Sequence, residues 1–381
     1  MKINTDGNIE WQKRYSFGWG TNCEAMTALK GGGFAILNRA DSCRFIDPKN
    51  GSSWLIVTDS LGEVQLEKCF PKETLDYCAS MIQLDNGDLI LAGPSTGGSV
   101  WLLCMDTTGE IQWRQTYHDG FCRSLIPTHD GSFLLVGLTY ELYVPFNSWI
   151  MKVDSMGVQQ WLRYYGGEDN DCFGDAIADS LHNIIVVGVV DKNLESSPPF
   201  QPLRHSGWLL VTDSIGGIRT ERIYDLADET LLSAVQEVSD RGYLIFGAIG
   251  EGPDSSREYS NILLRVDMDG DTLWTRTEGD GWENADPITL GSGEVIALPE
   301  YLESTFLNNN KSFWLFKATN RLKPVFSWFH EQDSTGQLGY PAAAGMLVDG
   351  YYLCASYQYP APPDSVWEKI FENGIQPPED N

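Results

Sequence analysis

Short apolar runs recur along the whole chain at nearly even spacing, and most of them end at a tight polar turn. Five of six such runs close with Asp-x-x-Gly, and the runs begin at Trp54, Trp101, Trp149, Trp208, Ile262 and Trp314. The steps between these starting residues are 47, 48, 59, 54 and 52 residues. A nearly fixed period of this size indicates an array of one supersecondary unit, in which each unit buries its apolar face against its neighbours.

A second apolar run follows a polar turn in each unit. Seven copies of this turn begin at Gly31, Asn86, Asp130, His182, Arg241, Ser292 and Asp349. Asp-Gly and Asn-Gly favour tight hairpins because glycine accepts a positive φ. We name the four strands of a unit A to D; in the first unit they are expected near residues 24–29, 34–38, 54–59 and 63–69. Helical periodicity is absent, so the sequence predicts an all-β, seven-bladed β-propeller of four-stranded blades. The tryptophans that begin strand C are expected to be structural.

The two ends of the chain each resemble part of a unit. Residues 6–15 match a C–D turn and strand D, as in residues 156–165, and residues 365–371 match a strand C. We therefore expect one domain over residues 1–381, closed by a composite blade. Strands A, B and C would come from the end of the chain, residues 1–16 would supply the outer strand, and residues 372–381 would be a tail. Residues 1–4 also resemble part of strand C, which leaves the exact division open.

Composition excludes some partners. The formal net charge is −27 and the isoelectric point is about 4.4, so the surface should repel nucleic acid. No run of 18 apolar residues is present, so no membrane span is expected. No secretory leader is visible, which fits either a cytoplasmic protein or a mature fragment with an added Met. We expect a monomer.

One repeat resembles a known bacterial family. Residues 149–167 combine Trp-x-x-Lys-x-Asp-x-x-Gly with Trp161, Tyr165, Gly166 and Gly167, and the later turn reads Asp-Gly-Gly-Tyr in the family. This pattern is similar to the repeats of bacterial secreted β-propellers that often precede type IX secretion sorting domains. The resemblance implies a secreted or cell-surface protein, with a cytoplasmic protein as the alternative. It implies no catalytic residue.

The cysteines and acidic turns do not predict a metal or cofactor site. Four cysteines, Cys23, Cys78, Cys122 and Cys172, share one repeat position near the start of strand A. Equivalent atoms of diverging blades should lie too far apart for a disulfide, so we expect reduced, buried thiols. The ligand spacing of a zinc site is absent. Residues 267–278 resemble a calcium loop but lack glycine at the sixth position, which favours a polar turn.

The D–A loops are the candidate ligand surface, because these loops and the B–C loops share one face of a propeller. They carry aromatic rings beside acids and amides, a combination that suits carbohydrate recognition. The expected ligand-binding residues are Trp19, Phe121, Glu168, Asp171, Trp282, Glu283 and Tyr340. The longest insertions, at residues 139–147, 196–204 and 251–260, lie in B–C loops of the same face.

Three functions remain open. The preferred one is an exported or cell-surface binding or adhesion module for a carbohydrate or a protein. The second is a glycan-active enzyme, a hydrolase or lyase, that uses carboxylates among Glu168, Asp171, Asp175, Asp228, Glu283 and Asp286. The third is a structural spacer. No serine nucleophile elbow, phosphate-binding loop or dinucleotide fingerprint is present.

Overall fold

The fold is described from a computed structural model. The structure describes the following residues: 2–3, 9–11, 13, 15, 21–40, 52–71, 75, 77–95, 98–118, 120–139, 147–167, 171–191, 205–238, 241–252, 257–280, 288–289, 295–297, 313–318, 324–330, 341–347 and 350–355. Every regular element in these ranges is a β-strand, so this part of the chain is all-β.

Five four-stranded antiparallel sheets follow one another along residues 21–280, each made of consecutive strands. The first two contain β3 (Thr21–Ala28), β4 (Phe34–Ala40), β5 (Ser52–Thr58) and β6 (Val64–Pro71), then β7 (Ser80–Gln83), β8 (Leu89–Pro94), β9 (Ser99–Met105) and β10 (Ile111–His118). The third and fourth contain β11 (Phe121–Pro127), β12 (Phe133–Leu138), β13 (Ser148–Val153) and β14 (Gln159–Tyr165), then β15 (Asp171–Ala178), β16 (Ile184–Asp191), β17 (His205–Thr212) and β18 (Ile218–Tyr224). The fifth contains β19 (Glu229–Glu237), β20 (Tyr243–Glu251), β21 (Glu258–Val266) and β22 (Thr272–Asp280).

Strands at the two ends of the chain pair with each other. The pairing order is β2-β1-β28-β27, where β1 is Lys2–Ile3, β2 is Ile9–Trp11, β27 is Pro341–Leu347 and β28 is Gly350–Ala355. Strand β1 therefore takes the third position, which the sequence analysis gave to residues 365–371; those residues lie outside the described ranges. Four further strands pair in chain order, β23 (Ile288–Thr289), β24 (Val295–Ala297), β25 (Phe313–Ala318) and β26 (Pro324–His330).

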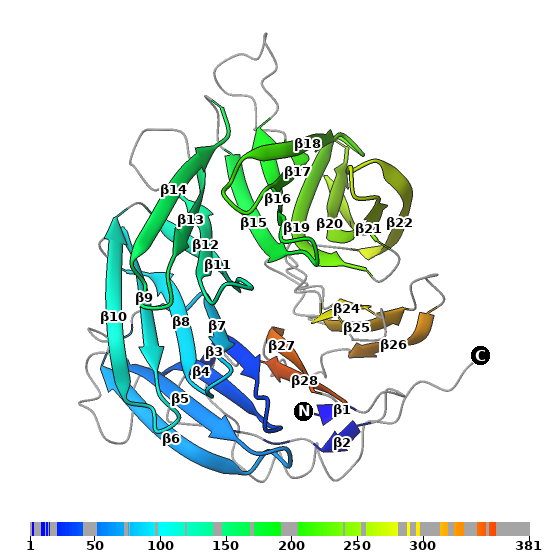
Figure 1. Ribbon diagram of the computed structural model, residues 1–381. Coiled ribbons are helices and arrows are strands. Elements are labelled where there is room, and N and C mark those ends of the chain that lie inside the picture. The colour runs from blue at the N-terminus through cyan, green and yellow to red at the C-terminus, as the bar shows by residue number, and fades with distance from the viewer. Residues whose placement is uncertain are drawn as a thin grey trace.

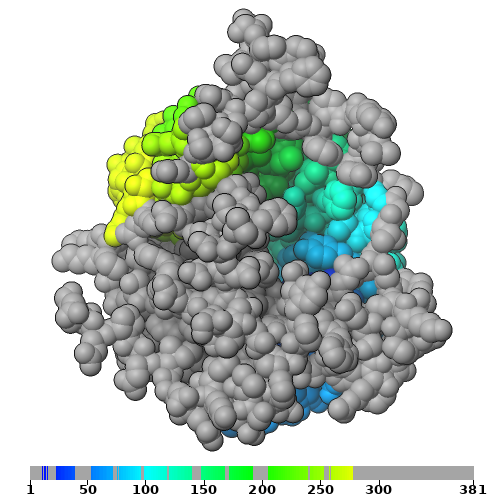
Figure 2. Space-filling model, turned by 180° about the vertical axis from the view of Figure 1, so that it is seen from behind, coloured from blue at the N-terminus to red at the C-terminus, as the bar shows by residue number. Residues whose placement is uncertain are grey.

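The sheets are arranged around a common centre. Figure 1 shows the first strands of successive sheets, such as β7, β11, β15 and β19, nearer the centre, and the last strands, such as β10, β14 and β22, at the perimeter. Figure 2 shows the described residues from behind, with a hollow between the yellow-green and cyan parts of the surface. Strands A are therefore the inner strands and strands D the outer ones.

In three of the described sheets, strand B carries a glycine opposite the tryptophan of strand C, whereas in the first sheet Asn38 stands opposite Trp54. Gly137 pairs with Trp149, and a Cβ on Gly137 would lie 2.5 Å from the Trp149 ring and 2.0 Å from the Phe121 carbonyl oxygen. Gly93 and Trp101 are paired in the same way. The missing side chain thus makes room for the large ring beside it. This explains why the repeat places glycine and tryptophan at these positions.

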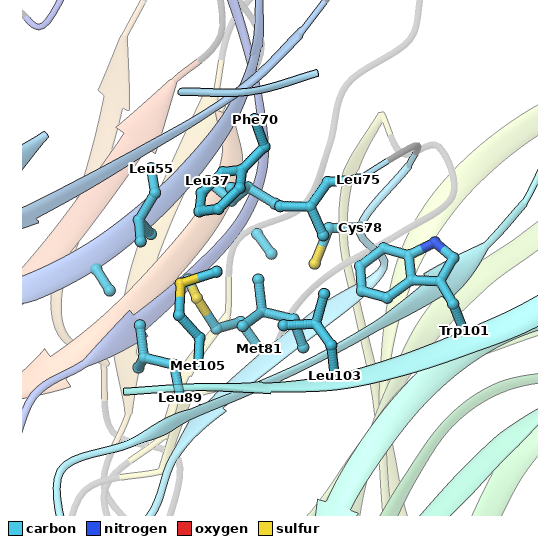
Figure 3. Packing of buried hydrophobic residues seen from close by; sticks show 13 residues of the cluster. Leu37, Leu55, Phe70, Leu75, Cys78, Met81, Leu89, Trp101, Leu103 and Met105 are labelled. Carbon is cyan, nitrogen blue, oxygen red and sulfur yellow. The ribbon is translucent and has the colours of Figure 1, made fainter. Parts of the chain in front are cut away.

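The core lies between neighbouring sheets. In Figure 3, Leu37, Leu55 and Phe70 of one sheet face Met81, Leu103 and Met105 of the next, with Cys78 and Trp101 at one end. The strand-C tryptophans Trp54, Trp101, Trp149 and Trp208 are at most 4% exposed, which confirms that they are structural. The Trp314 side chain lies outside the described residues.

The Asp-x-x-Gly turns share one geometry. Asp59 accepts hydrogen bonds through Oδ1 from the backbone N–H groups of Leu61 and Glu63, both at 2.9 Å, and Gly62 has a φ of +72°. The turns of Asp106, Asp154, Asp213 and Asp267 repeat these bonds at 2.7–3.0 Å. The carboxylate holds the turn and glycine takes the left-handed position. At Asp267 the chain continues into β22, so this segment is a polar turn rather than a calcium loop.

A tyrosine in or just after strand D joins several neighbouring sheets. The Tyr165 hydroxyl donates to the Gly216 carbonyl oxygen at 2.8 Å, and Tyr224 donates to Gly270 at 2.7 Å. Tyr15 and Tyr117 make the same bond to Gly62 and Gly157. Burial raises the pKa of Tyr165 to about 12, so the phenol keeps its proton. The Trp-x-x-x-Tyr part of the repeat therefore joins neighbouring sheets.

The repeated cysteines are free thiols, as expected. Cys23, Cys78 and Cys122 are buried, and burial raises the pKa of Cys122 to about 12. Cys172 is only partly buried, which corrects the expectation for that residue. Arg123, an exposed residue of the preceding sheet, acts electrostatically on Cys172.

Candidate functional site

The two edges of the sheets differ in construction. One edge carries the A–B and C–D turns, and the other carries the D–A and B–C connections. Of the seven residues expected to bind ligand on the second edge, Phe121 and Asp171 are described. Trp19, Glu168, Trp282, Glu283 and Tyr340 lie outside the described residues, so their role stays a prediction.

Asp171 and Phe121 both begin an inner strand. Asp171 is 4% exposed, and its carboxylate accepts a hydrogen bond from the Gly167 N–H at 2.5 Å. Its backbone oxygen accepts a bond from the Ser148 hydroxyl at 2.9 Å. Asp171 therefore ties the start of β15 to the backbone of Gly167 and to Ser148. Phe121 is half-buried and pairs with Leu138 at the start of β11.

Two other predicted acids bind the backbone of neighbouring segments. Asp175 accepts a hydrogen bond from the Val235 N–H of the next sheet at 3.1 Å. Asp228 accepts a bond from the Gly252 N–H at 2.9 Å. The first bond joins two inner strands, β15 and β19, and the second joins the residue before β19 to the residue after β20. Glu283 and Asp286 lie outside the described residues.

A cluster of ionisable side chains joins two neighbouring sheets on the D–A/B–C edge. Its centre is Glu229, the first residue of β19, whose side chain is 7% exposed. One carboxylate oxygen lies 2.6 Å from Nδ1 of His205, the first residue of β17. The other accepts hydrogen bonds from Arg257 and from the Tyr259 hydroxyl, each at 2.5 Å. The His205 Nε2 lies 3.1 Å from Asp191, the last residue of β16. We call these five residues the Glu229 cluster.

The charges of the cluster are strongly coupled. Burial alone would raise the pKa of Glu229, but hydrogen bonds from His205, Tyr259 and Arg257 outweigh burial and lower it to about 2. Burial and the bond to Glu229 raise the pKa of Tyr259 to about 12. The pKa of Arg257 is raised by its bonds to Tyr259 and Glu229, against the effect of burial. At neutral pH Glu229 is therefore a carboxylate surrounded by donors.

The cluster fixes the bases of two B–C connections. Asp191 and His205 are paired residues on either side of residues 192–204, and Arg257 and Tyr259 follow residues 253–256. Both segments overlap insertions that the sequence predicts on the ligand face, at residues 196–204 and 251–260. His205 is the most exposed side chain of the four that form ion pairs, at 27%. The cluster thus places a partly accessible imidazole at the junction of two sheets.

Sequence reasoning did not predict this cluster. The residues that bind Glu229 come from two sheets, and His205 and Arg257 are 24 and 28 positions away from it. One signal could have been used, because His205 and Tyr259 both lie three residues before the first residue of the apolar run of strand C.

The described residues give no metal centre of three or more ligands. No group of three or more His, Cys, Asp or Glu side chains in them could hold an ion. Within the same ranges no helix is long and apolar enough to cross a membrane.

The Glu229 cluster should make the free energy of unfolding depend on pH in the acidic range. The pKa of Glu229 is depressed from 4.5 to about 2, so its contribution to stability is complete above about pH 4.5 and is lost as the pH falls toward 2. We expect a loss of up to about 3 kcal/mol from this group. Urea unfolding at several pH values should show a smaller acid-induced loss in Glu229→Gln than in the unchanged chain.

A matched control is Glu63→Gln, which removes an exposed partner of Lys13. Exposed pairs contribute little, so this variant should follow the pH dependence of the unchanged chain. Equal acid dependence in Glu229→Gln and the unchanged chain would contradict the role of the cluster.

Comparison with solved structures identifies the fold. The structure is similar to the Dos1 propeller with a TM-score of 0.51 and 11% identity, covering 94% of this chain and 95% of that one. The chain folds as a β-propeller. A protein of unknown function from Bacteroides caccae matches with a TM-score of 0.43 and 12% identity, over 72% of this chain and 88% of that one. The β-propeller domain of the Trilobed protease from Pyrococcus furiosus matches with a TM-score of 0.43 and 10% identity, over 83% and 96%. No protein family profile and no curated protein matches the chain.

Proposed function

We propose that the chain is an exported binding module whose ligand, a carbohydrate or a protein surface, contacts the D–A/B–C face of a seven-bladed propeller. The blade number follows from seven copies of the A–B turn in the sequence. Closure of the ring by a composite blade is supported by the pairing of β1 with β28. Both ends of the chain would then contribute to one blade, which removes two free sheet edges.

Export is supported by the resemblance of residues 149–167 to repeats of secreted bacterial propellers. A second support is that Cys69 is disulfide-bonded, because disulfides are rare in reducing compartments. The free thiols of Cys78 and Cys122 are compatible with an oxidising compartment, since burial raises their pKa and keeps them unreactive.

The D–A/B–C face is proposed as the ligand-binding surface because it differs in construction from the A–B/C–D face. On the A–B/C–D face, Asp59, Asp106, Asp154, Asp213 and Asp267 all bind their own turns. The D–A/B–C face differs from blade to blade, and it carries the Glu229 cluster at one junction. Ligand-binding surfaces are typically variable connections held on a rigid scaffold. The variable face therefore suits recognition better than the repeated one.

The proposal predicts which substitutions weaken binding. The probe is a glycan array on the purified 381-residue protein, followed by calorimetry with the best glycan. Trp19→Ala and Trp282→Ala should each reduce affinity tenfold or more, because stacking on a flat ring is lost. The melting temperature should change little. Protein ligands would be tested in the same way if no glycan binds.

The matched controls are Leu61→Ala and Ile215→Ala on the A–B/C–D face, where these side chains are 65% and 60% exposed. They should leave affinity unchanged. A ligand that loses affinity in the controls and keeps it in the tryptophan variants would show that the working surface is the opposite face.

A further inference from the structure

Two histidines of neighbouring blades meet on the A–B/C–D face. His129 lies in the turn between β11 and β12, and His182 lies in the turn between β15 and β16. Their Nδ1 atoms are 2.9 Å apart and their ring centroids are 4.1 Å apart, although the residues are separated by 53 positions. Both residues are exposed. The pair does not form a metal-binding sequence motif, because each blade supplies one of the two rings.

The backbone under His182 is held by a buried carboxylate. Asp179 is fully buried and accepts hydrogen bonds from the N–H groups of Leu181 and Asn183 at 2.9 and 2.7 Å. The Tyr243 hydroxyl of the next blade also donates to Asp179 at 2.9 Å. His182 has a φ of +65°, at a turn position that Gly32, Gly87 and Gly131 occupy, also with positive φ, in three other described turns. The turn is therefore rigid, and it presents an imidazole in a left-handed conformation.

The turn that contains His129 is also held by a carboxylate, as the turn of His182 is. The Asp130 carboxylate accepts bonds from the Thr128 hydroxyl at 2.5 Å and the Ser132 N–H at 3.1 Å. Lys152 forms an ion pair with Asp130 at 2.6 Å. This carboxylate is thus engaged within its own blade. The two rings are placed by separate rigid turns, which is the arrangement that preorganises a binding site.

The distance between the two nitrogens favours some metal ions over others. Neutral imidazole is a ligand for copper, nickel and zinc. At zinc–nitrogen distances of about 2.0–2.1 Å, two tetrahedral ligand atoms lie about 3.3 Å apart. At about 2.0 Å, two adjacent ligands of a square-planar ion lie about 2.8 Å apart, which is the geometry of Cu(II) or Ni(II). The observed 2.9 Å is closer to the second value.

We propose that His129 and His182 form an inter-blade site for one Cu(II) or Ni(II) ion, bound through their two Nδ1 atoms. The described residues give no third His, Cys, Asp or Glu for such a site, so water completes the coordination. The proton shared between the two Nδ1 atoms must move to Nε2 of its own ring when the ion binds, so that both Nδ1 atoms offer a lone pair and each neutral ring keeps one N–H. The ion links two blades, so it stabilises the folded chain.

Nickel titration of the full chain tests the site, since free thiols do not reduce Ni(II). Calorimetry at about pH 7.5 should show one ion per chain, with binding that weakens on acidification. His129→Gln should lower the affinity at least tenfold. His182→Asn should do the same while keeping the turn, because Asn tolerates a positive φ. Electron paramagnetic resonance of the Cu(II) complex should show coupling to two nitrogens in the unchanged chain alone.

The matched control is His330→Gln, which removes one imidazole from another blade and should leave the nickel affinity unchanged. The melting temperatures of His129→Gln and His182→Asn in a chelator should equal that of the unchanged chain, because both rings are exposed. Retention of stoichiometric binding in the two single variants would overturn the proposal. An equal loss in His330→Gln, or no saturable binding by the unchanged chain, would overturn it as well.

Discussion

A chain that lacks residues 1–16 should lose its single cooperative unfolding transition and aggregate. Strand β1 pairs with β28, so the deletion leaves an unpaired sheet edge, which is a site of aggregation. The deletion also removes contacts with the first blade, where the Tyr15 hydroxyl donates to the Gly62 carbonyl oxygen at 2.7 Å and Trp11 packs on Phe34. Circular dichroism during heating and size-exclusion chromatography would measure both effects.

Deletion of residues 372–381 is the control, because the sequence analysis assigns them to a tail outside the repeats. That variant should unfold like the full chain. If the chain without residues 1–16 melts at the same temperature as the full chain and stays monomeric, the two ends do not close the ring.

Much of the fold could be predicted from local chemistry. An Asp that binds two following N–H groups and a Gly with positive φ define the C–D turn, so Asp-x-x-Gly predicts a hairpin wherever it follows an apolar run. The Trp runs predict buried strands, and Trp101, Trp149 and Trp208 are buried. Such features depend on neighbours within one unit, and a single sequence shows them directly.

Features that depend on two blades could not be predicted in this way. The bond from Tyr165 to Gly216 joins residues 51 positions apart, and the sequence does not show which turn the tyrosine reaches. The Glu229 cluster likewise needs the twist of two sheets to bring His205 and Arg257 to one carboxylate. The choice of β1 as the third strand of the closing sheet depends on pairing between the chain ends, where two segments resembled strand C.

Replacement of Trp208 by Ala should cost about 3–5 kcal/mol of the free energy of unfolding. Trp208 is 1% exposed, and its ring stacks on Phe173 with centroids 4.8 Å apart. Gly188 lies in β16, between the strands of the two rings, and it pairs with Phe173 on one side and with Trp208 on the other. Because Gly188 has no side chain, the two rings can meet over it. The substitution leaves a cavity between rigid strands that cannot collapse to fill it. Urea unfolding followed by tryptophan fluorescence and circular dichroism would give the change.

Tyr164→Ala is the matched control, since this ring is 52% exposed on strand D of the preceding blade. It should change the free energy of unfolding by less than about 0.5 kcal/mol. Gly188→Ala tests the same contact from the other side, because its Cβ would lie 2.1 Å from the Cys172 carbonyl oxygen and would push the strands apart. It should therefore also destabilise the chain. A loss well below 3 kcal/mol in Trp208→Ala, together with a neutral Gly188→Ala, would mean that the repeat does not owe its stability to this ring packing.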